Sequence, residues 1–404
     1  MSTVQAQAQA TDPNAGFIWR AQKVFLYLGV LYALLLVALT IPLFQLHAVY
    51  LHALKFPLFA DFNTPEKYGF APHKTHNLRL TASDNTTIGA WLVLADASHL
   101  ANHTVPTALS SHPTVIYLHG NAATRAVQFR VDQVQAFSSR LQTNVLAIDY
   151  RGFGDSDGLP SEHGLALDAR AAWDYLVQEN GVAPADIVVV GHSLGTGVAA
   201  RFASELEKEN VRPRGLALLA PFSSIRELLD TYYLAGFIPL LKPLAFIPGA
   251  ATVAKRFVSH NFNTLSTIHS IKAPLVIAHA LNDWDIPPTH SSVLFDSFVA
   301  PHLPPLPYMF QLQTQNPLAQ LQHSQKQWEE LQAALQKRAE KRSEWVNSWE
   351  VERLGEIEEL DRAAAFGGDE GKVVKVITKY GGHDRIGLQE GLQDLLADVF
   401  GLRT

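Results

Sequence analysis

Apolar stretches of two kinds alternate along most of this chain. Short runs with the length and composition of buried strands lie at 114–118, 145–148, 187–190, 216–219, 274–280 and 373–378. Longer stretches of helical character lie between or after them, at about 124–141, 162–179, 194–209 and 387–400. This alternation predicts an α/β fold, in which a mostly parallel central sheet carries helices on both faces. Ligands of such sheets bind beyond the carboxyl ends of the strands.

Two further apolar stretches precede this region and predict a β-hairpin. Residues 78–81 and 88–95 flank a polar tetrapeptide at 83–86 that has the composition of a turn. The segment that follows, 96–113, is polar, and we expect it to be a linker.

The N-terminal region has a different pattern. Residues 1–16 are mostly small and polar and predict a disordered tail. A run of apolar residues without a charged side chain then extends over 24–45, which is long enough to cross a bilayer. It lacks the short core and small-residue cleavage site of a signal peptide, and the alternative is a buried core helix. We therefore predict a transmembrane anchor at 17–46, followed by the α/β domain at 47–404.

The charges beside the anchor predict its orientation. Arg20 and Lys23 lie close to its N-terminal end, whereas the other side has no basic residue before Lys55. The positive-inside rule then places the N-terminus in the cytoplasm and the α/β domain on the exoplasmic side. Two glycosylation sequons, at Asn85 and Asn102, can be used only on that side.

Two insertions interrupt the alternation. Residues 222–272 are apolar and broken by prolines, and they occur where a lid over the ligand site is expected. Residues 301–370 begin Pro-rich, continue Gln-rich and become strongly charged and helical at about 325–362. We expect this second insertion to be a surface excursion that carries no chemistry.

Composition excludes several classes of function. The 404 residues are 47% hydrophobic, which permits a large core, and the formal net charge is −6. No cluster of basic residues in the α/β domain points to nucleic-acid binding. The chain has no cysteine, which excludes disulfides, thiolate metal sites and cysteine nucleophiles. We expect no metal and no cofactor.

The chemistry centres on Ser193. The sequence Gly191-His192-Ser193-Leu194-Gly195 follows one predicted buried strand and precedes a helix, which is the context of a nucleophile elbow. Glycines two positions either side of the serine permit the tight turn. The same stretch loosely fits a dinucleotide-binding fingerprint, but the next strand ends in Pro-Phe at 221–222 instead of the acidic residue that such a site needs.

A serine nucleophile needs a base, and the base needs an orienting carboxylate. In this fold the three occur in the order Ser, acid, His. Asp283 and His383 continue the order after Ser193, and each lies just beyond a predicted strand. Asp285 is the alternative acid, and Asp283 is preferred because it is nearer to the strand end.

Two backbone amides are expected to form the oxyanion hole. One belongs to Leu194, directly after the nucleophile, and the other to Asn121, after a His-Gly pair that follows the strand at 114–118.

Other histidines of the chain are not expected to transfer protons. His192 lies inside the elbow, His119 precedes the oxyanion loop and His279 lies within a strand, so we interpret all three as structural. His163 and Asp168 have the spacing of an acyltransferase pair, but they fall within a predicted helix away from the strand ends.

With these residues in hand, the chain resembles the α/β-hydrolase domain-containing protein 12-like family over about 78–300 and 373–400. The shared segments are Tyr-Leu-His-Gly-Asn-Ala at 117–122, Asp-Tyr-Arg-Gly-Phe-Gly-Asp-Ser at 149–156, Pro-Ser-Glu at 160–162, Gly-His-Ser-Leu-Gly-Thr-Gly-Val-Ala at 191–199 and Pro-Phe-Ser-Ser-Ile-Arg-Glu at 221–227. The resemblance implies a membrane-anchored serine hydrolase of the endoplasmic reticulum lumen that acts on lysophosphatidylserine and monoacylglycerols. It also implies that Ser193 is the nucleophile, Asp283 the acid and His383 the base.

The sequence thus predicts a single-pass, membrane-anchored serine hydrolase that cleaves esters of single-chain lipids. An apolar lid beside a membrane anchor favours a lipid substrate. An acyl-protein thioesterase would share the triad but would need a cytosolic active site. A non-catalytic membrane-binding protein is the remaining alternative, with the charged stretch at 325–362 as its interaction surface. The sequence identifies no protein partner.

Overall fold

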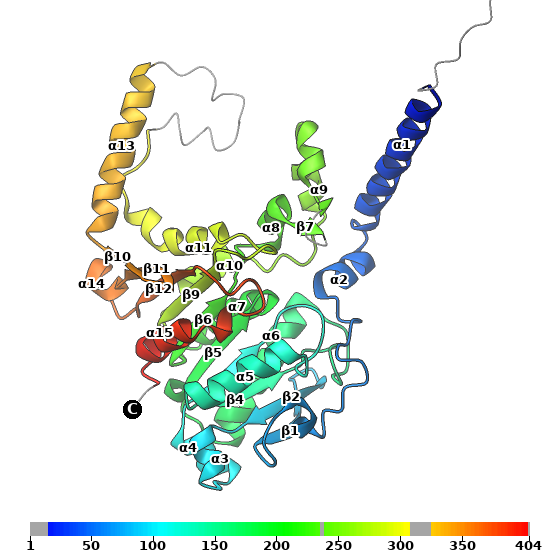
Figure 1. Cartoon of the computed structure of the whole chain (residues 1–404). Coiled ribbons are helices and arrows are strands. Elements are labelled where there is room, and N and C mark those ends of the chain that lie inside the picture. Colours follow the sequence, from blue (N-terminus) through cyan, green and yellow to red (C-terminus); the bar gives the residue numbers. More distant parts are fainter. Residues whose placement is uncertain (1–14, 235–237, 308–324, 403–404) are drawn as a thin grey trace, which may run out of the picture.

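The computed structural model describes residues 15–234, 238–307 and 325–402 (Figure 1). In these residues one ten-stranded sheet forms the centre of the α/β domain, in the order β1-β2-β4-β3-β5-β6-β9-β12-β11-β10. Its strands are β1 (Thr75–Thr81), β2 (Thr87–Val93), β3 (Thr114–Leu118), β4 (Asn144–Ile148), β5 (Ile187–His192), β6 (Gly215–Leu219), β9 (Leu275–Ala280), β10 (Val346–Val351), β11 (Gly355–Leu360) and β12 (Val373–Thr378). β7 (Tyr233–Leu234) and β8 (Ile238–Pro239) form a separate two-stranded ribbon.

The six strands from β4 to β12 run parallel, whereas the pairs at both ends of the sheet are antiparallel. The mostly parallel sheet and the antiparallel hairpin β1–β2 are therefore confirmed. Since all parallel strands point the same way, the loops after β3, β5, β9 and β12 lie at one edge of the sheet.

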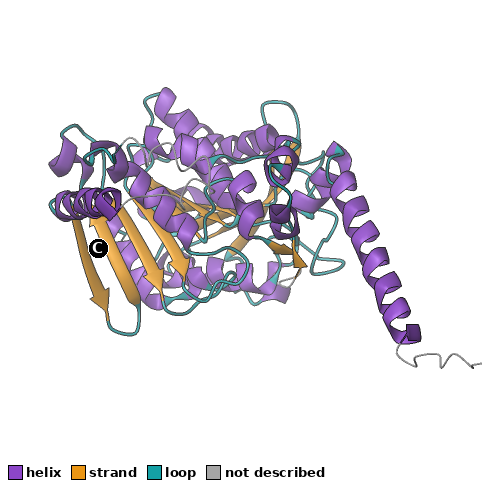
Figure 2. Ribbon diagram, turned by 90° about the horizontal axis from the view of Figure 1, so that it is seen from above, coloured by secondary structure: helices purple, strands orange, loops and turns teal. Residues whose placement is uncertain are grey.

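Helices cover both faces of the sheet (Figure 2). The helices are α1 (Ala15–Ala38), α2 (Pro42–Tyr50), α3 (Asp96–Leu100), α4 (Val105–Ser111), α5 (Gln128–Arg140), α6 (Glu162–Asp174), α7 (Leu194–Lys208), α8 (Ile225–Thr231), α9 (Ala250–Arg256), α10 (Thr264–Thr267), α11 (Thr289–Val299), α13 (Gln325–Ser343), α14 (Arg362–Phe366) and α15 (Glu390–Phe400). Residues of α6, α7 and α11 pack in one core cluster, and residues of α5 and α15 pack in another.

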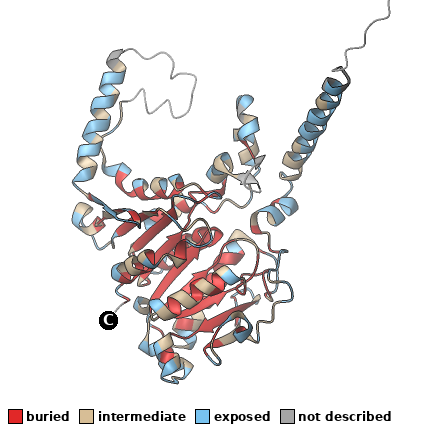
Figure 3. Ribbon diagram, in the orientation of Figure 1, coloured by how far each residue is buried: buried red, intermediate tan, exposed pale blue. Residues whose placement is uncertain are grey.

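Strand β5 shows why its sequence is continuously apolar. Ile187 and Val189 belong to the core on one face of the sheet, whereas Val188 and Val190 belong to the core on the other. A strand that is covered on both sides has no face left for polar side chains. All of β5 is buried, and the neighbouring central strands are also buried (Figure 3). This core fixes the position from which Ser193 emerges.

Two expectations from the sequence are wrong. The segment 96–113 is not a plain linker, because it contains the short helices α3 and α4. The helix expected at 325–362 ends at Ser343, and β10 and β11 follow as a hairpin that extends the central sheet beyond β12. These strands lie at the edge of the sheet, where charged side chains at solvent-facing positions are normal. Their high charge concealed the strand pattern, so the second half of the insertion belongs to the sheet.

The N-terminal apolar run forms two helices instead of one. The helix α1 ends at Ala38, and Pro42 occupies the first turn of α2. Trp19–Ala38 is long and apolar enough to cross a membrane, and none of it is buried in the protein. The prediction for 1–16 falls almost entirely on residues outside the described range.

The first insertion has an exposed part and a buried part. Residues 238–257 comprise β8, a 3-10 helix at Lys242–Phe246 and α9, and most of their side chains are exposed or half-buried. Beyond them, Phe262, Ile268 and Ile271 are fully buried against the sheet. These three side chains therefore attach the last part of the insertion to the core of the domain.

Candidate active site

Ser193 stands on a strained turn between β5 and α7. Its φ of 53° and ψ of −120° are unfavourable for a residue with a side chain. A Cβ on Gly195 would lie 2.0 Å from the carbonyl oxygen of Leu118, and one on Gly191 would lie 2.4 Å from the carbonyl oxygen of Gly195. Only glycines fit at these two positions, which is why the serine can be held in this conformation.

Three side chains from three loops form a hydrogen-bonded chain. His383, after β12, has its Nε2 2.8 Å from Ser193 Oγ and its Nδ1 2.8 Å from Asp283 Oδ2, after β9. The structure thus brings together all three residues that the sequence placed at strand ends. With Nδ1 donating to the carboxylate, Nε2 is left to accept the serine proton.

Asp283 is held as a carboxylate. Burial opposes its charge, but hydrogen bonds from His279, His383 and the backbone amide of Ile286 outweigh burial and keep its pKa well below the ordinary value. Its Oδ1 accepts from the backbone N–H groups of Asp285 and Ile286, both at 2.9 Å. A fixed, charged acid is what orients the imidazole and stabilises its protonated form.

His383 responds to these charges. Burial lowers its affinity for a proton, but the hydrogen bond and the negative charge of Asp283, with smaller effects of Asp285 and Asp384, raise its pKa above 6.5. The base is thereby strengthened for removing the proton of Ser193.

Two neighbours hold the turn that carries His383. His192 Nε2 donates to the carbonyl oxygen of His383 at 2.8 Å, and Asn282 Oδ1 accepts from the backbone N–H of Gly382 at 2.9 Å. Burial lowers the pKa of His192 to about 3, so this ring is neutral at physiological pH. Its interpretation as structural agrees with this contact.

His279 does more than fill the core. Its ring lies 3.2 Å from the Asp283 carboxylate, donates to the carbonyl oxygen of Ile286 at 2.8 Å and bonds the Ser291 hydroxyl at 2.8 Å. It fixes the loop that carries the acid, and its position four residues before Asp283 was the available sequence signal.

The backbone around the nucleophile provides candidate oxyanion donors. Leu194 is the first residue of α7, so its N–H has no partner within the helix. A Cβ on Gly120 would lie 3.0 Å from Ser193 Cβ, which shows that the loop after β3 passes directly beside the nucleophile. Asn121 follows in that loop, and its side chain donates to the carbonyl oxygen of Val49 at 3.4 Å.

Arg130 shapes this loop, and it was not among the site residues predicted from the sequence. Its buried guanidinium donates to the carbonyl oxygens of Gly120, Asn121 and Ala122 at 2.9–3.1 Å. The N–H groups of residues 122–124 donate to carbonyl oxygens in the segment 50–56. The loop after β3, which contains Asn121, is therefore held by hydrogen bonds from Arg130 of α5 on one side and to the segment after α2 on the other.

The remaining sequence candidates lie outside this chain of hydrogen bonds. Asp285 is exposed, whereas Asp168 is buried and binds Arg151 at 2.9 Å, away from His163. Asp283, Asp285 and His383 are close enough to hold a metal, each offering an atom within 4.8 Å of the others. The pairing of His383 with Asp283 and Ser193 accounts for two members of this cluster.

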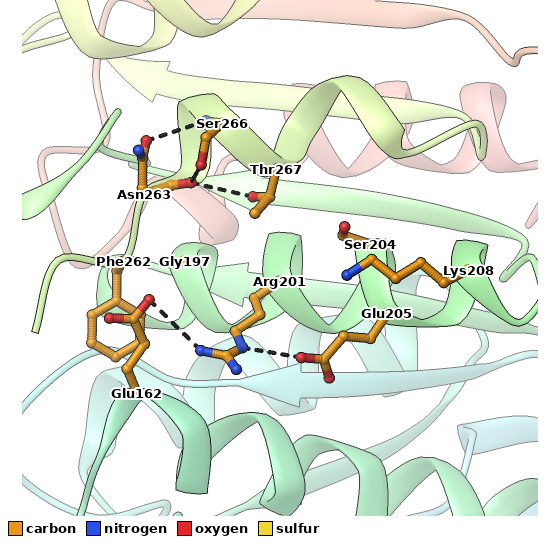
Figure 4. Close-up of a pocket in the computed structure, with 10 residues that line it drawn as sticks. All are labelled: Glu162, Gly197, Arg201, Ser204, Glu205, Lys208, Phe262, Asn263, Ser266 and Thr267. Atoms are coloured by element: carbon orange, nitrogen blue, oxygen red, sulfur yellow. Dashed lines mark hydrogen bonds and ion pairs between the residues drawn. The ribbon is translucent and has the colours of Figure 1, made fainter.

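A cavity of about 240 Å³ opens between α6, α7 and α10, but no triad residue lines it (Figure 4). Arg201 in its wall pairs with Glu205 at 3.0 Å and with Glu162 at 3.8 Å. The cavity is a polar hollow beside the site and does not hold the reacting groups.

The sheet order, the elbow and the three-residue chain define a serine hydrolase of the α/β type. A family model described as "Alpha/beta hydrolase family" matches residues 115–364. The crystal structure of an alpha-beta hydrolase from Vibrio vulnificus superimposes with a TM-score of 0.53 over 89% of this chain and 94% of that chain. Its identity of 16% supports the fold alone.

Comparison with curated proteins shows which group of this family the chain resembles in sequence. Lysophosphatidylserine lipase ABHD12 of Danio rerio is 31% identical over 304 residues, which cover 70% of this chain and 74% of that protein. Protein ABHD12B of Homo sapiens is 30% identical over 268 residues, which cover 61% and 68% of the two chains. This chain therefore belongs to the alpha/beta hydrolase family and, within it, to the group of the ABHD12 proteins.

Proposed function

We propose that this chain is a membrane-anchored serine hydrolase that cleaves the carboxylic ester of single-chain lipids, lysophospholipids or monoacylglycerols. The observation that carries the proposal is His383, which bridges Ser193 Oγ and Asp283 Oδ2 at 2.8 Å on both sides. Two features favour a lipid substrate: the apolar helix α1 beside the domain, and relatives that bear the name lysophosphatidylserine lipase.

In the first half of the reaction, Ser193 Oγ attacks the ester carbonyl carbon while its proton passes to His383 Nε2. The N–H groups of Leu194 and Asn121 hold the oxyanion that forms. When this intermediate collapses, the ester bond breaks and His383 returns the proton to the departing glycerol oxygen. An acyl-Ser193 ester remains on the enzyme.

In the second half, water occupies the place of the departed alcohol. His383 takes a proton from the water as its oxygen attacks the acyl carbon, and then protonates Ser193 Oγ as the fatty acid leaves. Asp283 keeps its charge throughout and stabilises the imidazolium in both halves.

For the location, we propose a single pass through the endoplasmic reticulum membrane, with the active site in the lumen. Arg20 and Lys23, in the N-terminal part of α1 and before its charge-free stretch, favour this orientation. Asn85 and Asn102, the two proposed glycosylation sites, are exposed. A mass shift that glycosidase removes, and that is lost when both are changed to Gln, tests the orientation.

Labelling with a fluorophosphonate probe tests the nucleophile. Ser193→Ala is expected to abolish labelling, because the probe reacts with an activated serine. Ser223→Ala is a matched control, since Ser223 Oγ also lies 3.0 Å from a histidine, His290 Nδ1. Persistent labelling of Ser193→Ala, or its loss in folded Ser223→Ala, would contradict the assignment.

The substrate class is tested separately. Wild type and Ser193→Ala are compared on lysophospholipids, monoacylglycerols and acyl thioesters. Serine-dependent turnover of the lipid esters supports the proposal. Turnover of acyl thioesters alone would favour the thioesterase alternative, and turnover of nothing despite probe labelling would exclude both lipid classes.

A further inference from the structure

The first insertion contacts the candidate membrane span itself. The hydroxyl of Tyr32 donates to the carbonyl oxygen of Leu240 at 2.8 Å. Tyr32 lies within Trp19–Ala38, a span of 20 residues. At 1.5 Å per residue this span is about 30 Å long, which equals the thickness of the hydrocarbon core of a bilayer.

The hydrogen bond between Tyr32 and Leu240 indicates how deep Leu240 lies in the bilayer. Arg20 and Lys23 lie in the first turns of this span, so the charge-free part that can lie in the hydrocarbon core begins at Val24. Ala38 follows about 21 Å later along the helix and therefore lies no farther out than the opposite edge of the core. Tyr32 is six residues before Ala38 and so lies at least about 9 Å inside that edge. Even if its side chain reaches toward the interface, Leu240 is placed at or below the boundary of the core.

The chain beyond Leu240 has the surface of a membrane-inserted segment. Phe246 is 91% exposed and Ile247 60%, and Val253 and Phe257 are also exposed. Side chains of this kind in a continuous stretch are unfavourable in water. In Figure 1, α9 extends from the ribbon β7–β8 in the same general direction as α1.

The charges agree with this environment. No acidic residue occurs at 231–257, and the charged residues there are Lys242, Lys255 and Arg256. Lys255 pairs with Asp230, which lies just before this stretch on α8. Basic residues that border apolar ones are typical of segments lying in the interface of a bilayer.

Gln45 of α2 holds the C-terminal end of the segment next to the helix that follows the membrane span. Its buried side chain donates to the carbonyl oxygen of Phe257 at 2.6 Å and accepts from the backbone N–H of Ser259 at 2.9 Å. At its other end the segment is joined to the chain after α8, because the backbone N–H of Leu240 donates to the carbonyl oxygen of Tyr232 at 3.1 Å. Helix α8 follows β6 at the edge of the sheet from which Ser193 emerges.

We propose that residues 240–257 insert into the bilayer leaflet that holds the C-terminal half of α1. Substrate would then reach Ser193 directly from this leaflet, without passing through water. This proposal rests on the proposed function insofar as α1 spans a bilayer. An enzyme with this segment selects a lipid that is dispersed in the membrane. The exposed apolar side chains of 240–257 then contact the acyl chains of that membrane.

The absence of cysteine in the chain permits a direct test. Ile247→Cys in the full-length protein is labelled with an NBD fluorophore and reconstituted in phosphatidylcholine vesicles. We expect quenching by nitroxide-labelled lipids and protection from aqueous iodide. The matched control is Leu100→Cys on α3, 79% exposed, where we expect the reverse.

Two outcomes would overturn the proposal. If the Ile247 probe is quenched by iodide as strongly as the Leu100 probe, the segment lies in water. If it is protected from both quenchers, a second protein surface covers it. Neither measurement depends on catalysis, so the test stands even if Ser193 proves not to be the nucleophile.

An activity measurement completes the test. The double variant Phe246→Asp, Ile247→Asp should reduce hydrolysis of a vesicle-embedded monoacylglycerol about tenfold, while hydrolysis of a water-soluble short-chain ester stays within about twofold of wild type. Leu100→Asp should leave both rates unchanged. A parallel loss of both rates in a folded double variant would show that the segment acts on the site and not on the membrane.

Discussion

The two insertions of this hydrolase both extend from the central sheet, but one lies beside the apolar helix α1 and the other lies at the far edge of the sheet. The first, at 222–272, touches α1 through Tyr32 and carries exposed aromatic and aliphatic side chains. The second, at 301–370, is joined to the far edge of the sheet through β10 and β11. Its helix α13 also projects from the domain in Figure 1, but its sequence is charged and polar.

The surroundings of the two insertions predict different contributions to the reaction. The first lies next to the loops after β5 and β9, and its outer surface suits lipid. The second is held by ion pairs, such as those of Arg342 with Asp296 at 2.9 Å and with Glu358 at 3.0 Å. We therefore expect substitutions to reduce the rate of hydrolysis most at the active site, less in the first insertion and least in the second.

The largest effect is expected at the acid. Asp283→Asn should reduce kcat about 10⁴-fold, because an amide can hold the imidazole in the wrong tautomer and cannot stabilise its positive charge. Asp285→Asn is the matched control two residues away, and its exposed carboxylate should be worth less than about tenfold. Steady-state rates on a short-chain ester decide the matter. Equal losses in the two variants would make Asp285 a partner of the base.

The pH profile should show the same acid acting on the base. His383 must be neutral to accept a proton, and Asp283 raises its pKa above 6.5. The rate constant kcat/KM should therefore fall about tenfold per pH unit below that raised pKa, at a higher pH than for an isolated histidine. Residual activity of Asp283→Asn should fall only at lower pH, since the negative charge is gone. Profiles from about pH 5 to about pH 9 test this, and an unshifted limb in the variant would contradict it.

These two predictions concern the part of the molecule that the sequence predicted best. That Ser193, Asp283 and His383 lie within hydrogen-bond reach of one another was predictable, because each follows a buried strand and strand ends of a parallel sheet share one edge. Arg130 was missed because its role depends on which carbonyl oxygens the folded loop turns toward it. No local pattern in the sequence encodes such a contact.

The fold was predicted where burial dominates and was missed where it does not. The central strands are apolar at every position because both faces are covered, as Val188 and Val189 show. At the sheet edge, β11 alternates buried Ile357 with the glutamates on either side of it, and that short alternation was masked by the charged helix before it. The break between α1 and α2 was indicated by Pro42, but its place depends on Gln45 docking to the first insertion.

A smaller effect is expected where the first insertion meets α2. Gln45→Leu removes both hydrogen bonds to the chain at 257–259 and leaves two part-buried backbone groups without their side-chain partner. We expect hydrolysis of vesicle-embedded lipid to fall about fivefold, an effect of about 1 kcal/mol, with little change on a soluble short-chain ester. Gln128→Leu, an exposed glutamine on α5, is the control. Loss on both substrates would mean that the clamp serves the oxyanion loop.

The smallest effect is expected in the second insertion. Arg342→Ala removes two ion pairs that are only partly buried, so the free energy of unfolding should fall by about 1 kcal/mol and the melting temperature by about 2 °C. Arg353→Ala, at a fully solvated turn position, should change neither quantity. Both variants should hydrolyse soluble and vesicle-embedded esters at the wild-type rate, because the side-chain hydrogen bonds of Ser193, Asp283 and His383 involve no described residue of β10, β11 or α13. A selective loss on the vesicle-embedded lipid in Arg342→Ala would break the contrast between the insertions, since it would give the charged one a part in reaching the substrate.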